Sequence, residues 1–586
     1  MIAKMKKVFV VSPAAARERT LEALRDIGVV HLEPVDPKAG APEDLLDAID
    51  RTKRALRILE AVVPGGGKPD VSPADAVAET LRVFRRTEEN HHRLGTLARE
   101  VIRLRMWGDV RREQLDALAG ADVPVRFYSV PAKRIDQVQA ECVAVVGNLP
   151  GKRRLTAVIH RDGEPELPED AQTIELPDRD LPTVRAEARE TDEALAADAD
   201  RLGQLARLVP EIEAERARLA GQAEFAAAAN GALVGKDLWA VQGWVPAAPA
   251  ETLAGQLAER GIRAGVDSRD PTAEEEPPTL IEYPRLVRPI KGLFDMLGTV
   301  AGYKEFDVSI PFMIALPIFA AMLIGDGAYG AILLLGPLLL YRKATKALGV
   351  QFTRLVMVIG AAAVGWGLLN GSFFGVVLYT PLIPVDMSDE SRNLVMRITF
   401  FMAAIHLSLA QLWRGVALWP SLKALGRLGW AIFIWGMLGV VQYFVLNQPL
   451  GMFTYLLAVG AALAILFEEP SWNPLKMLGL GLANFPLSML SAFSDVISYV
   501  RLMAVGLASG VMAASFNDLA LSTGSWALAV PILIFGHGLN IGLAMIAIFA
   551  HGVRLNMLEF SNNLGMQWTG RDYQPFAEPI PEEIRT

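Results

Sequence analysis

Charge is distributed very unequally along this chain of 586 residues, and the imbalance limits what the chain can fold into. Residues 309–560 contain 12 of its 57 lysine and arginine residues and 9 of its 65 acidic residues. The other 334 residues carry the remaining 101 charges. A charged fraction of about 8% beside one of about 30% is typical of a membrane domain joined to a soluble domain. This distribution excludes a purely cytosolic protein.

Composition excludes several further classes of function. The single cysteine, Cys142, excludes a disulfide framework and any metal or iron–sulfur site built from several cysteines. A net charge of −8, with basic residues interleaved among acidic ones, argues against binding to nucleic acid. Only the four apolar residues from Val8 to Val11 follow the basic N-terminus, too few for the core of a signal peptide. We therefore expect the soluble half to stay in the cytoplasm.

In the soluble half the sequence predicts strands separated by long charged helices. A strand at Lys7–Val11, a helix at Ala14–Ile27 and a strand at Val29–Leu32 predict a small α/β unit that needs partners from later in the chain. Apolar residues recur every three or four positions in 42–118 and again in 184–228, which predicts helices that run out and back. An antiparallel coiled-coil arm is the main interpretation, and a helical bundle lobe is the alternative. Strand-like runs lie between these helices and again after them, so we expect a globular tip assembled from both sides.

The apolar half divides into seven runs. They cover Ile310–Tyr341, Leu355–Leu378, Ile398–Leu412, Leu428–Leu446, Met452–Phe467, Leu478–Phe516 and Trp526–Val553. Basic residues connect the first run to the second and the third to the fourth, so these connections should be cytoplasmic. Acidic residues at 386, 389 and 390 mark the opposite side, although Arg392 and Arg397 weaken that signal.

The first run starts and ends beside basic residues and must therefore cross the membrane twice. As one helix, its 32 residues would be about 48 Å long, against a hydrocarbon core of about 30 Å. Gly325-Asp326-Gly327 supplies a break at the middle of the run. We expect two short helices there, which gives eight spans with both termini cytoplasmic. A single, steeply tilted helix is the alternative.

The sixth run carries a polar stripe that does not suit a lipid-facing helix. Its members are three or four residues apart and share a helical face: Ser488, Ser491, Asp495, Ser498 and Arg501. An arginine at the bilayer centre costs about 2.5–3.5 kcal/mol and needs an acidic partner or a water-filled cavity. For Arg501, the alternative is a static salt bridge to Asp495 or to a neighbouring helix.

The last run repeats this pattern. One face carries His537, Asn540, Ala544, His551 and Arg554, and Glu559 follows near the end. Arg554 lies near the helix end, where it could instead extend into the headgroup region. Because an arginine keeps its proton, any moving proton needs a carboxylate. With no comparable carboxylate predicted beside Arg501, we expect another subunit to supply it.

Two other polar residues have both a structural and a functional interpretation. His406 is either a packing histidine or part of an ion path. Asp326 either caps the second short helix or hydrates an aqueous entrance. The isolated intramembrane histidines do not predict a metal site.

Several motifs then resemble one known family. Residues 498–508, Ser-Tyr-Val-Arg-Leu-Met-Ala-Val-Gly-Leu-Ala, closely resemble the arginine-bearing helix of the membrane stator subunit of V-type and archaeal-type (V/A) rotary ATPases. This family is called subunit a, or subunit I in bacteria. Further similar motifs lie at 5–31, 243–246, 325–330, 370–375 and 551–555, the last followed by Glu559. They occur in the same order and cover nearly the whole chain.

The resemblance implies a cytoplasmic α+β arm with two small α/β lobes and eight membrane helices that form ion half-channels beside a rotor ring. By position, Arg501 and Arg554 match the two arginines of the family that face the rotor carboxylate. The half-channel candidates are Asp326, Asp495, Ser498, His551, Glu559 and His406. Ala544 and Ser509 stand where eukaryotic relatives have an acidic residue and a histidine, so the aqueous path along the last helix differs from theirs.

The implied function is proton translocation coupled to ATP hydrolysis or synthesis, in a cell membrane, with the N-terminal arm and the C-terminus cytoplasmic. The implied partners are the proteolipid rotor ring, peripheral stalk subunits, the central-stalk and ring-adaptor parts of the complex and membrane lipid. No cofactor is expected. A secondary transporter with a cytosolic regulatory arm is the alternative, and a non-transporting scaffold is a third interpretation. The sequence does not distinguish H⁺ from Na⁺, because the side chains that bind the ion should lie mainly on the ring.

The expected domains follow from these patterns. They are 1–40, the first part of a membrane-proximal lobe; 41–120, the outgoing helices; 121–182, a distal lobe; 183–232, the returning helix; 233–270, the remainder of the distal lobe; 271–308, the remainder of the proximal lobe and a linker; 309–560, the membrane domain; and 561–586, a cytoplasmic tail.

Overall fold

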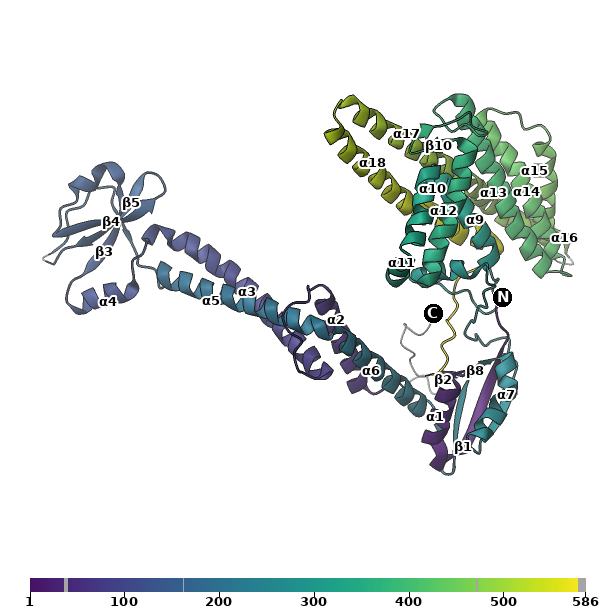
Figure 1. Cartoon of the computed structure of the whole chain (residues 1–586), viewed down its shortest axis with the longest axis horizontal. Helices are drawn as coiled ribbons and strands as arrows, with labels where there is room; N and C mark the ends of the chain where they lie inside the picture. Colours follow the sequence, from purple (N-terminus) through teal and green to yellow (C-terminus); the bar gives the residue numbers. More distant parts are fainter. Residues whose placement is uncertain (36–39, 162, 471–472, 578–586) are drawn as a thin grey trace. The chain divides into compact units, whose positions relative to one another are not determined.

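The computed structural model describes residues 1–35, 40–161, 163–470 and 473–577. They form two compact units (Figure 1). The first unit combines Met1–Glu33 with Leu233–Thr586, and the second is Pro34–Ala232. The expected tail at 561–586 lies only partly within the described residues, which stop at Ala577.

An antiparallel sheet in the first unit joins distant parts of the sequence. Its strands are β1 (Met5–Pro13), β2 (His31–Glu33), β7 (Leu233–Val234), β8 (Leu238–Pro246) and β9 (Gly265–Arg269). β1 lies between β8 and β9, while β2 and β7 pair with β8. The helices α1 (Arg17–Ile27) and α7 (Ala247–Glu259) contact each other and the sheet.

The assignment of 233–270 to the distal lobe is therefore wrong. All nine residues of β1 pair in register with all nine of β8, from Met5 opposite Pro246 to Pro13 opposite Leu238. β1 also buries Met5 and Val8, so it needs this partner to close its own core. A strand pattern predicts that a segment pairs but does not identify its partner.

The second unit has its own sheet and core. Its strands are β3 (Val125–Pro131), β4 (Cys142–Leu149), β5 (Arg153–Ile159) and β6 (Gln172–Ile174), in the order β4-β5-β3-β6. Its helices are α2 (Glu43–Glu60), α3 (Pro73–Leu104), α4 (Arg112–Gly120), α5 (Leu181–Leu205) and α6 (Val209–Asn230). The sheet comes from one continuous segment and contains no strand from 233–270.

Ion pairs connect α3 to α5, which run side by side (Figure 1). Arg201 donates from Nε and Nη2 to Glu79, at 2.7 and 2.9 Å, and its guanidinium lowers the pKa of that carboxyl. Arg86 donates from Nε to Asp198 Oδ2 at 3.0 Å and from Nη2 to the other carboxylate oxygen. Glu79 pairs with Arg201, and the later residue Arg86 pairs with the earlier residue Asp198, so α3 and α5 are antiparallel.

Beyond the first sheet, the chain is almost entirely helical. Among the described residues, five helical stretches are long and apolar enough to cross a membrane: Val350–Asn370, Asp389–Ala417, Lys423–Leu446, Leu475–Ser522 and Trp526–Leu564. They contain α12, α13, α14, α16 with α17, and α18, respectively. Three shorter apolar helices are α9 (Ser309–Ile324), α10 (Gly327–Leu339) and α15 (Phe453–Phe467).

The first apolar run contains two helices, as the sequence predicts. α9 ends at Ile324, and Gly325 has a φ of +72°, a left-handed conformation that favours glycine. α10 then packs against α12 at close range, since an added Cβ on Gly330 would lie 2.6 Å from the backbone nitrogen of Val364. The break itself lies beside the end of α12, where Asn370 Nδ2 donates to the carbonyl of Gly325 at 2.8 Å. The two helices therefore form a hairpin.

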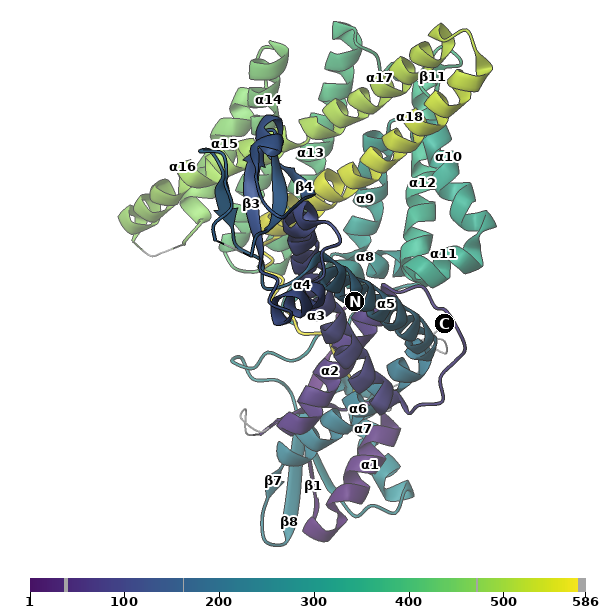
Figure 2. The ribbon, with the colours of Figure 1, turned by 90° about the vertical axis from the view of Figure 1, so that its left-hand side faces the viewer.

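The helix ends separate into two groups. The ring of Phe306, just before α9, contacts that of Trp413 near the end of α13, with centroids 5.6 Å apart. Arg427, at the start of α14, binds Glu468, just after α15, at 3.0 Å. In the opposite group, Asn517, near the turn between α17 and α18, donates its Nδ2 to the carbonyl of Phe374 in the loop that follows α12, at 2.7 Å. Figure 2 shows α17 (Val500–Ser522) and α18 (Trp526–Ala547) side by side.

Two segments fasten the helical region to the N-terminal sheet. After the last helix, the chain returns so that the buried Phe576 donates its amide to the carbonyl of Val30 at 2.8 Å. Burial lowers the pKa of His31, whose Nδ1 lies 2.9 Å from the carbonyl of Gln574. Glu275 lies in the expected linker and accepts from Arg269, which holds the pKa of the Glu275 carboxyl well below its usual range.

Candidate functional site

The arginine of the polar stripe lies at the start of α17 and is paired within its own chain. Arg501 Nη2 donates to Glu559 Oε1 at 2.9 Å, and its Nε donates to the carbonyl of Ser498 at 2.9 Å. The Arg501 side chain is 25% exposed and that of Glu559 only 5%. The expectation that Arg501 has no comparable carboxylate in its own chain is therefore wrong.

The second arginine approaches the same acid. Arg554 Nε lies 3.6 Å from Glu559 Oε1, and the Arg554 side chain is 52% exposed. The other carboxylate oxygen, Oε2, is buried and has no hydrogen-bond partner among the described residues. Two guanidinium groups thus share one carboxylate oxygen, and the three side chains together carry a net charge of +1.

An unusual helix geometry brings these groups together. After α18, the chain forms two π-helical turns, Ile548–Val553 and Leu555–Phe560, on either side of Arg554. Residues five apart are separated by about 140° around an α-helix, but π-helical i→i+5 hydrogen bonding brings them onto one side. This places Glu559 beside Arg554. Such π-helical turns often occur at functional sites.

A second acid continues the cluster. Asn563 Nδ2 donates to Asp495 Oδ2 at 2.8 Å and to the carbonyl of Glu559 at 2.7 Å. Gln411 Nε2, from α13, donates to Asn563 Oδ1 at 2.9 Å. Asp495 and Glu559 are thereby linked through one amide. Asn563 and Gln411 were not predicted from the sequence, although Asn563 lies one helical turn beyond Glu559.

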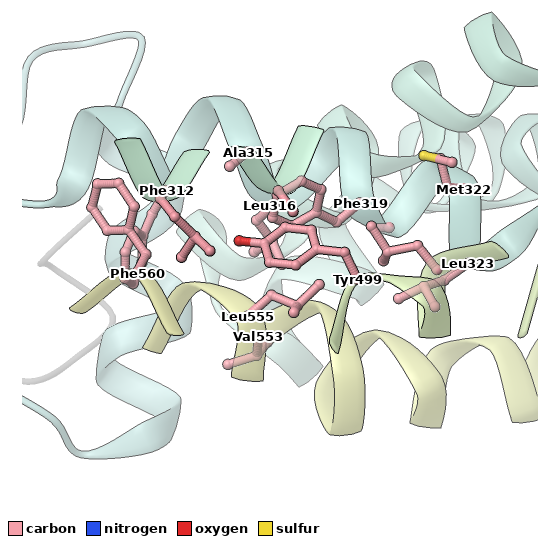
Figure 3. Close-up of a cluster of buried hydrophobic side chains, with 14 of the residues drawn as sticks. Phe312, Ala315, Leu316, Phe319, Met322, Leu323, Tyr499, Val553, Leu555 and Phe560 are labelled. Atoms are coloured by element: carbon pink, nitrogen blue, oxygen red, sulfur yellow. The ribbon is translucent and has the colours of Figure 1, made fainter. Parts of the chain in front are cut away.

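A layer of buried aromatic side chains packs around Tyr499, which is close to Arg501 in the sequence. Figure 3 shows Tyr499 between Phe319 of α9 and Leu555 of the last helix. The hydroxyl of Tyr499 lies 2.7 Å from His406 Nδ1. The His406 ring also stacks on Phe560, with centroids 4.4 Å apart. These contacts favour the packing interpretation of His406.

The remaining candidates have more limited roles in this geometry. Ser498 Oγ donates to the carbonyl of Ser494 on its own helix, while the Ser498 carbonyl accepts from Arg501. His551 has a buried Nδ1 without a hydrogen-bond partner among the described residues. Within the described chain, no group of three or more His, Cys, Asp or Glu side chains could hold a metal ion.

Asp326 is fully buried and acts as a structural cap. Its carboxylate accepts five hydrogen bonds, from the amides of Ala328, Tyr329, Phe374 and Gly375 and from the hydroxyl of Ser372. It thereby starts α10 and fixes the loop after α12. With this many donors, the capping interpretation is favoured over an aqueous entrance.

A second polar cluster, the α10–α18 cluster, lies near this cap and was not predicted. It consists of Tyr329, Ser509, Asn517, His537 and Asn540. Tyr329 Oη lies 2.7 Å from His537 Nδ1, and Asn517 Oδ1 lies 3.1 Å from His537 Nε2. Asn540 Nδ2 donates to Tyr329 Oη at 3.2 Å, while Ser509 Oγ lies 3.1 Å from Asn540 Oδ1. These contacts join α10, α17 and α18.

Comparison with known proteins identifies the family. No protein-family model matches the chain. V-type ATP synthase subunit I 1 of Treponema pallidum (strain Nichols) is 30% identical over 639 residues, which cover 99% of this chain and 100% of that protein. The chain belongs to the V-type ATP synthase subunit I family. V-type ATP synthase subunit I of Borreliella burgdorferi (strain ATCC 35210) is 28% identical over 620 residues, with 99% and 100% coverage.

One of the solved structures similar to this subunit I chain covers less than half of it. It is the cytoplasmic N-terminal domain of subunit I, homolog of subunit a, of V-ATPase. It is 17% identical and covers 45% of this chain and 100% of that chain. The TM-score of 0.19 is too low to show a shared fold.

For a member of the subunit I family, the arginine cluster has a clear chemical capacity. Two guanidinium groups can hold two carboxylates, and Glu559 occupies only one of these places. The exposed half of Arg554 and the partly exposed Arg501 remain accessible to a second acid. The cluster can therefore bind and stabilise one more carboxylate from outside the chain.

Proposed function

We propose that this chain is the membrane stator of a V/A-type rotary ATPase and that Arg501 and Arg554 face a carboxylate on a proteolipid rotor ring. The observation that carries this proposal is the net charge of +1 on Arg501, Arg554 and Glu559, with Arg554 half exposed. An incoming carboxylate would neutralise these three side chains.

The mechanism follows from the charge of the guanidinium groups. A ring carboxylate takes up a proton from one aqueous half-channel, crosses the lipid in its neutral form and returns to the arginines. There the positive charge favours the ionised form, so the proton leaves through the second half-channel. A fixed positive charge also blocks direct leakage of protons between the half-channels. One charge that crosses 100 mV is worth about 2.3 kcal/mol, which rotation passes to other subunits.

We assign the cytoplasmic half-channel to the side of Asp495. Its link through Asn563 to Glu559 supplies a polar path from the arginines toward the end of the last helix. Ser498 and His551 remain candidate channel residues near the arginines. The hydrogen bonds of Asp326 and the packing of His406 favour supporting roles for these two residues.

The proposed topology has eight spans with both termini cytoplasmic. It counts α9 and α10 separately, followed by α12, α13, α14, α15, α16 with α17, and α18. The two groups of helix ends and the basic connections after α10 and α13 support this count. Residues 309–560 form the membrane domain in this proposal, and the helices of 41–120 and 183–232 form an antiparallel coiled-coil arm. The arm holds peripheral stalks, and the central stalk, ring adaptor and membrane lipid complete the proposed partners.

Replacement of Arg501 tests the proposal. The assembled complex is reconstituted into liposomes, and ATP-driven acidification is measured for Arg501→Ala, Arg501→Lys and the control Arg392→Ala. The Arg392 side chain is 42% exposed and pairs locally with Asp389, so its loss should leave pumping unchanged. Arg501→Ala should abolish pumping, and Arg501→Lys should impair it because lysine lacks the planar fork. Normal pumping by Arg501→Ala would refute the mechanism.

Purification of the complex separates this proposal from a secondary transporter. A stator should co-purify with a proteolipid ring and stalk subunits, whereas a transporter should purify alone. A transporter would also be expected to have inverted repeats with broken helices at matching positions. The break between α9 and α10 is a left-handed turn at Gly325, whereas the junction of α16 and α17 at Tyr499 keeps a helical backbone conformation, so the two do not match.

A further inference from the structure

The α10–α18 cluster contains a titratable residue that the proposed mechanism does not use. Tyr329 is fully buried, Asn540 is 1% exposed and His537 is half-buried. His537 and Asn540 lie one turn apart on α18 and face α10 and α17 together. The cluster therefore connects the α9–α10 hairpin to the helix pair that carries Arg501 and Arg554.

The hydrogen bonds determine which ring nitrogen of His537 carries the proton. Asn517 Nδ2 donates to the carbonyl of Phe374 at 2.7 Å, so its Oδ1 faces His537 Nε2 as an acceptor. Nε2 must then carry the proton, which leaves Nδ1 as an acceptor. Tyr329 consequently donates its hydroxyl proton to His537 Nδ1 at 2.7 Å.

This arrangement leaves no place for a second ring proton. A protonated Nδ1 would donate to the Tyr329 oxygen, which already accepts from Asn540 Nδ2 at 3.2 Å. The Tyr329 hydroxyl would then have to donate elsewhere, and no other acceptor is hydrogen-bonded to it among the described residues. A buried donor without a partner destabilises the arrangement.

We propose that His537 is a proton-sensing positioning residue whose neutral form holds α10 against α17 and α18, and whose protonation from the non-cytoplasmic side slows ion translocation. This inference rests on the proposed function and on the proposed topology, which places Asn517 and His537 on the non-cytoplasmic side of Arg501. The class of regulation is feedback by protons accumulated on that side.

The charged and titratable groups around His537 are few. Tyr329 faces it from α10, and the fully hydrogen-bonded Asp326 lies just before α10. Asp518 follows Asn517 on α17 and is exposed. The loop after α12 contributes the ring of Phe374, with a centroid 5.2 Å from that of His537. His537 is therefore the group whose titration changes the hydrogen bonds of the cluster.

The decisive variant is His537→Gln. A glutamine can accept from Tyr329 and donate to Asn517, yet it does not titrate. The complete complex is reconstituted into liposomes with the ATPase head outside, and the lumen is buffered at pH 7.5 or 5.5 at fixed external pH. ATP-driven turnover of the wild type should fall at least fivefold more than that of His537→Gln between the two lumenal pH values. Since both complexes work against the same pH difference, thermodynamic back-pressure affects them equally.

The control and a second variant keep the test decisive. His160→Gln changes a histidine of the second unit and should respond to lumenal pH like the wild type. Tyr329→Phe removes the hydroxyl that occupies His537 Nδ1 but keeps the aromatic packing, so it should shift the pH response. Equal responses of wild type, His537→Gln and Tyr329→Phe, within twofold, would overturn the inference. If His537→Gln does not assemble, the response of Tyr329→Phe alone decides.

Nitrogen-15 spectroscopy of the same complex gives an independent readout. The His537 ring should show a neutral Nε2–H form at lumenal pH 7.5 and an increased fraction of the doubly protonated form at pH 5.5. A ring that stays neutral at both values would overturn the inference. Arg501→Ala separates the two proposals, because normal pumping by that variant refutes the proposed function, whatever His537 does. If Arg501→Ala loses pumping and His537→Gln responds to lumenal pH as the wild type does, the inference about His537 is refuted while the proposed function stands.

Discussion

The ion pair between Arg86 and Asp198 gives an asymmetric prediction for the stability of the second unit. The Asp198 side chain is 1% exposed, whereas that of Arg86 is 59% exposed. Arg86→Ala leaves a buried carboxylate without its partner, which costs about 3–5 kcal/mol. Asp198→Ala instead releases an arginine that water already reaches, so its cost should be about 1 kcal/mol. The double variant should then be about as stable as Asp198→Ala.

Urea unfolding of residues 34–232, followed by circular dichroism, measures these free energies. The fragment contains a complete compact unit with its own core. Arg54→Ala provides the matched control, because the Arg54–Asp50 pair has side chains 63% and 55% exposed. Its loss should change the free energy of unfolding by less than about 1 kcal/mol. The reasoning is refuted if Asp198→Ala costs as much as Arg86→Ala, or if the two single effects add.

Three further predictions concern the first unit. Glu559→Gln removes the resident negative charge and should slow ATP-driven pumping about tenfold, since the arginines then hold the ring carboxylate more tightly; unchanged pumping with normal assembly would contradict this. Gly330→Ala should destabilise the subunit by about 1–3 kcal/mol in detergent thermal melts, because the added Cβ meets the backbone of α12, whereas Gly336→Ala meets no atom within 4 Å and should be neutral. Glu275 has a lowered pKa, so its contribution to stability is present above its ordinary pKa of 4.5 and is lost as the pH falls below that value. The protection factors of the β1 and β9 amides, which correct for the slower intrinsic exchange at low pH, should therefore fall on acidification toward pH 3 in the wild type, and less so in Glu275→Gln.

The sequence predicted those features that depend on local pattern. The break at Gly325 follows from the length of the apolar run and from the conformation that glycine allows, and the structure contains it. The strand at Lys7–Val11 also follows from local pattern and is contained in β1. The partner of β1 could not be predicted, since β8 lies more than 220 residues away and its alternation would suit either sheet.

The partner of Arg501 was missed for a different physical reason. In a regular α-helix, Glu559 would lie on a different side of the last helix from Arg554. The residue types in this segment do not predict a π-helical turn. The α10–α18 cluster was missed because Tyr329, Asn517 and His537 are ordinary residues in apolar runs. Their meeting depends on how three helices pack. The polar face that contains His537 and Asn540 was the one available signal.

The resident acid resolves a difficulty in the proposed mechanism. Two guanidinium groups without a carboxylate would be costly to bury, and they would hold an arriving ring carboxylate through several charge-assisted bonds, each worth about 1.5–3 kcal/mol. With Glu559 in place, the guanidinium groups divide their hydrogen bonds between two carboxylates, and they keep the carboxylate of their own chain when the ring carboxylate leaves. In the proposed mechanism, the arginines can therefore bind the rotor carboxylate and release it again without being left unpaired.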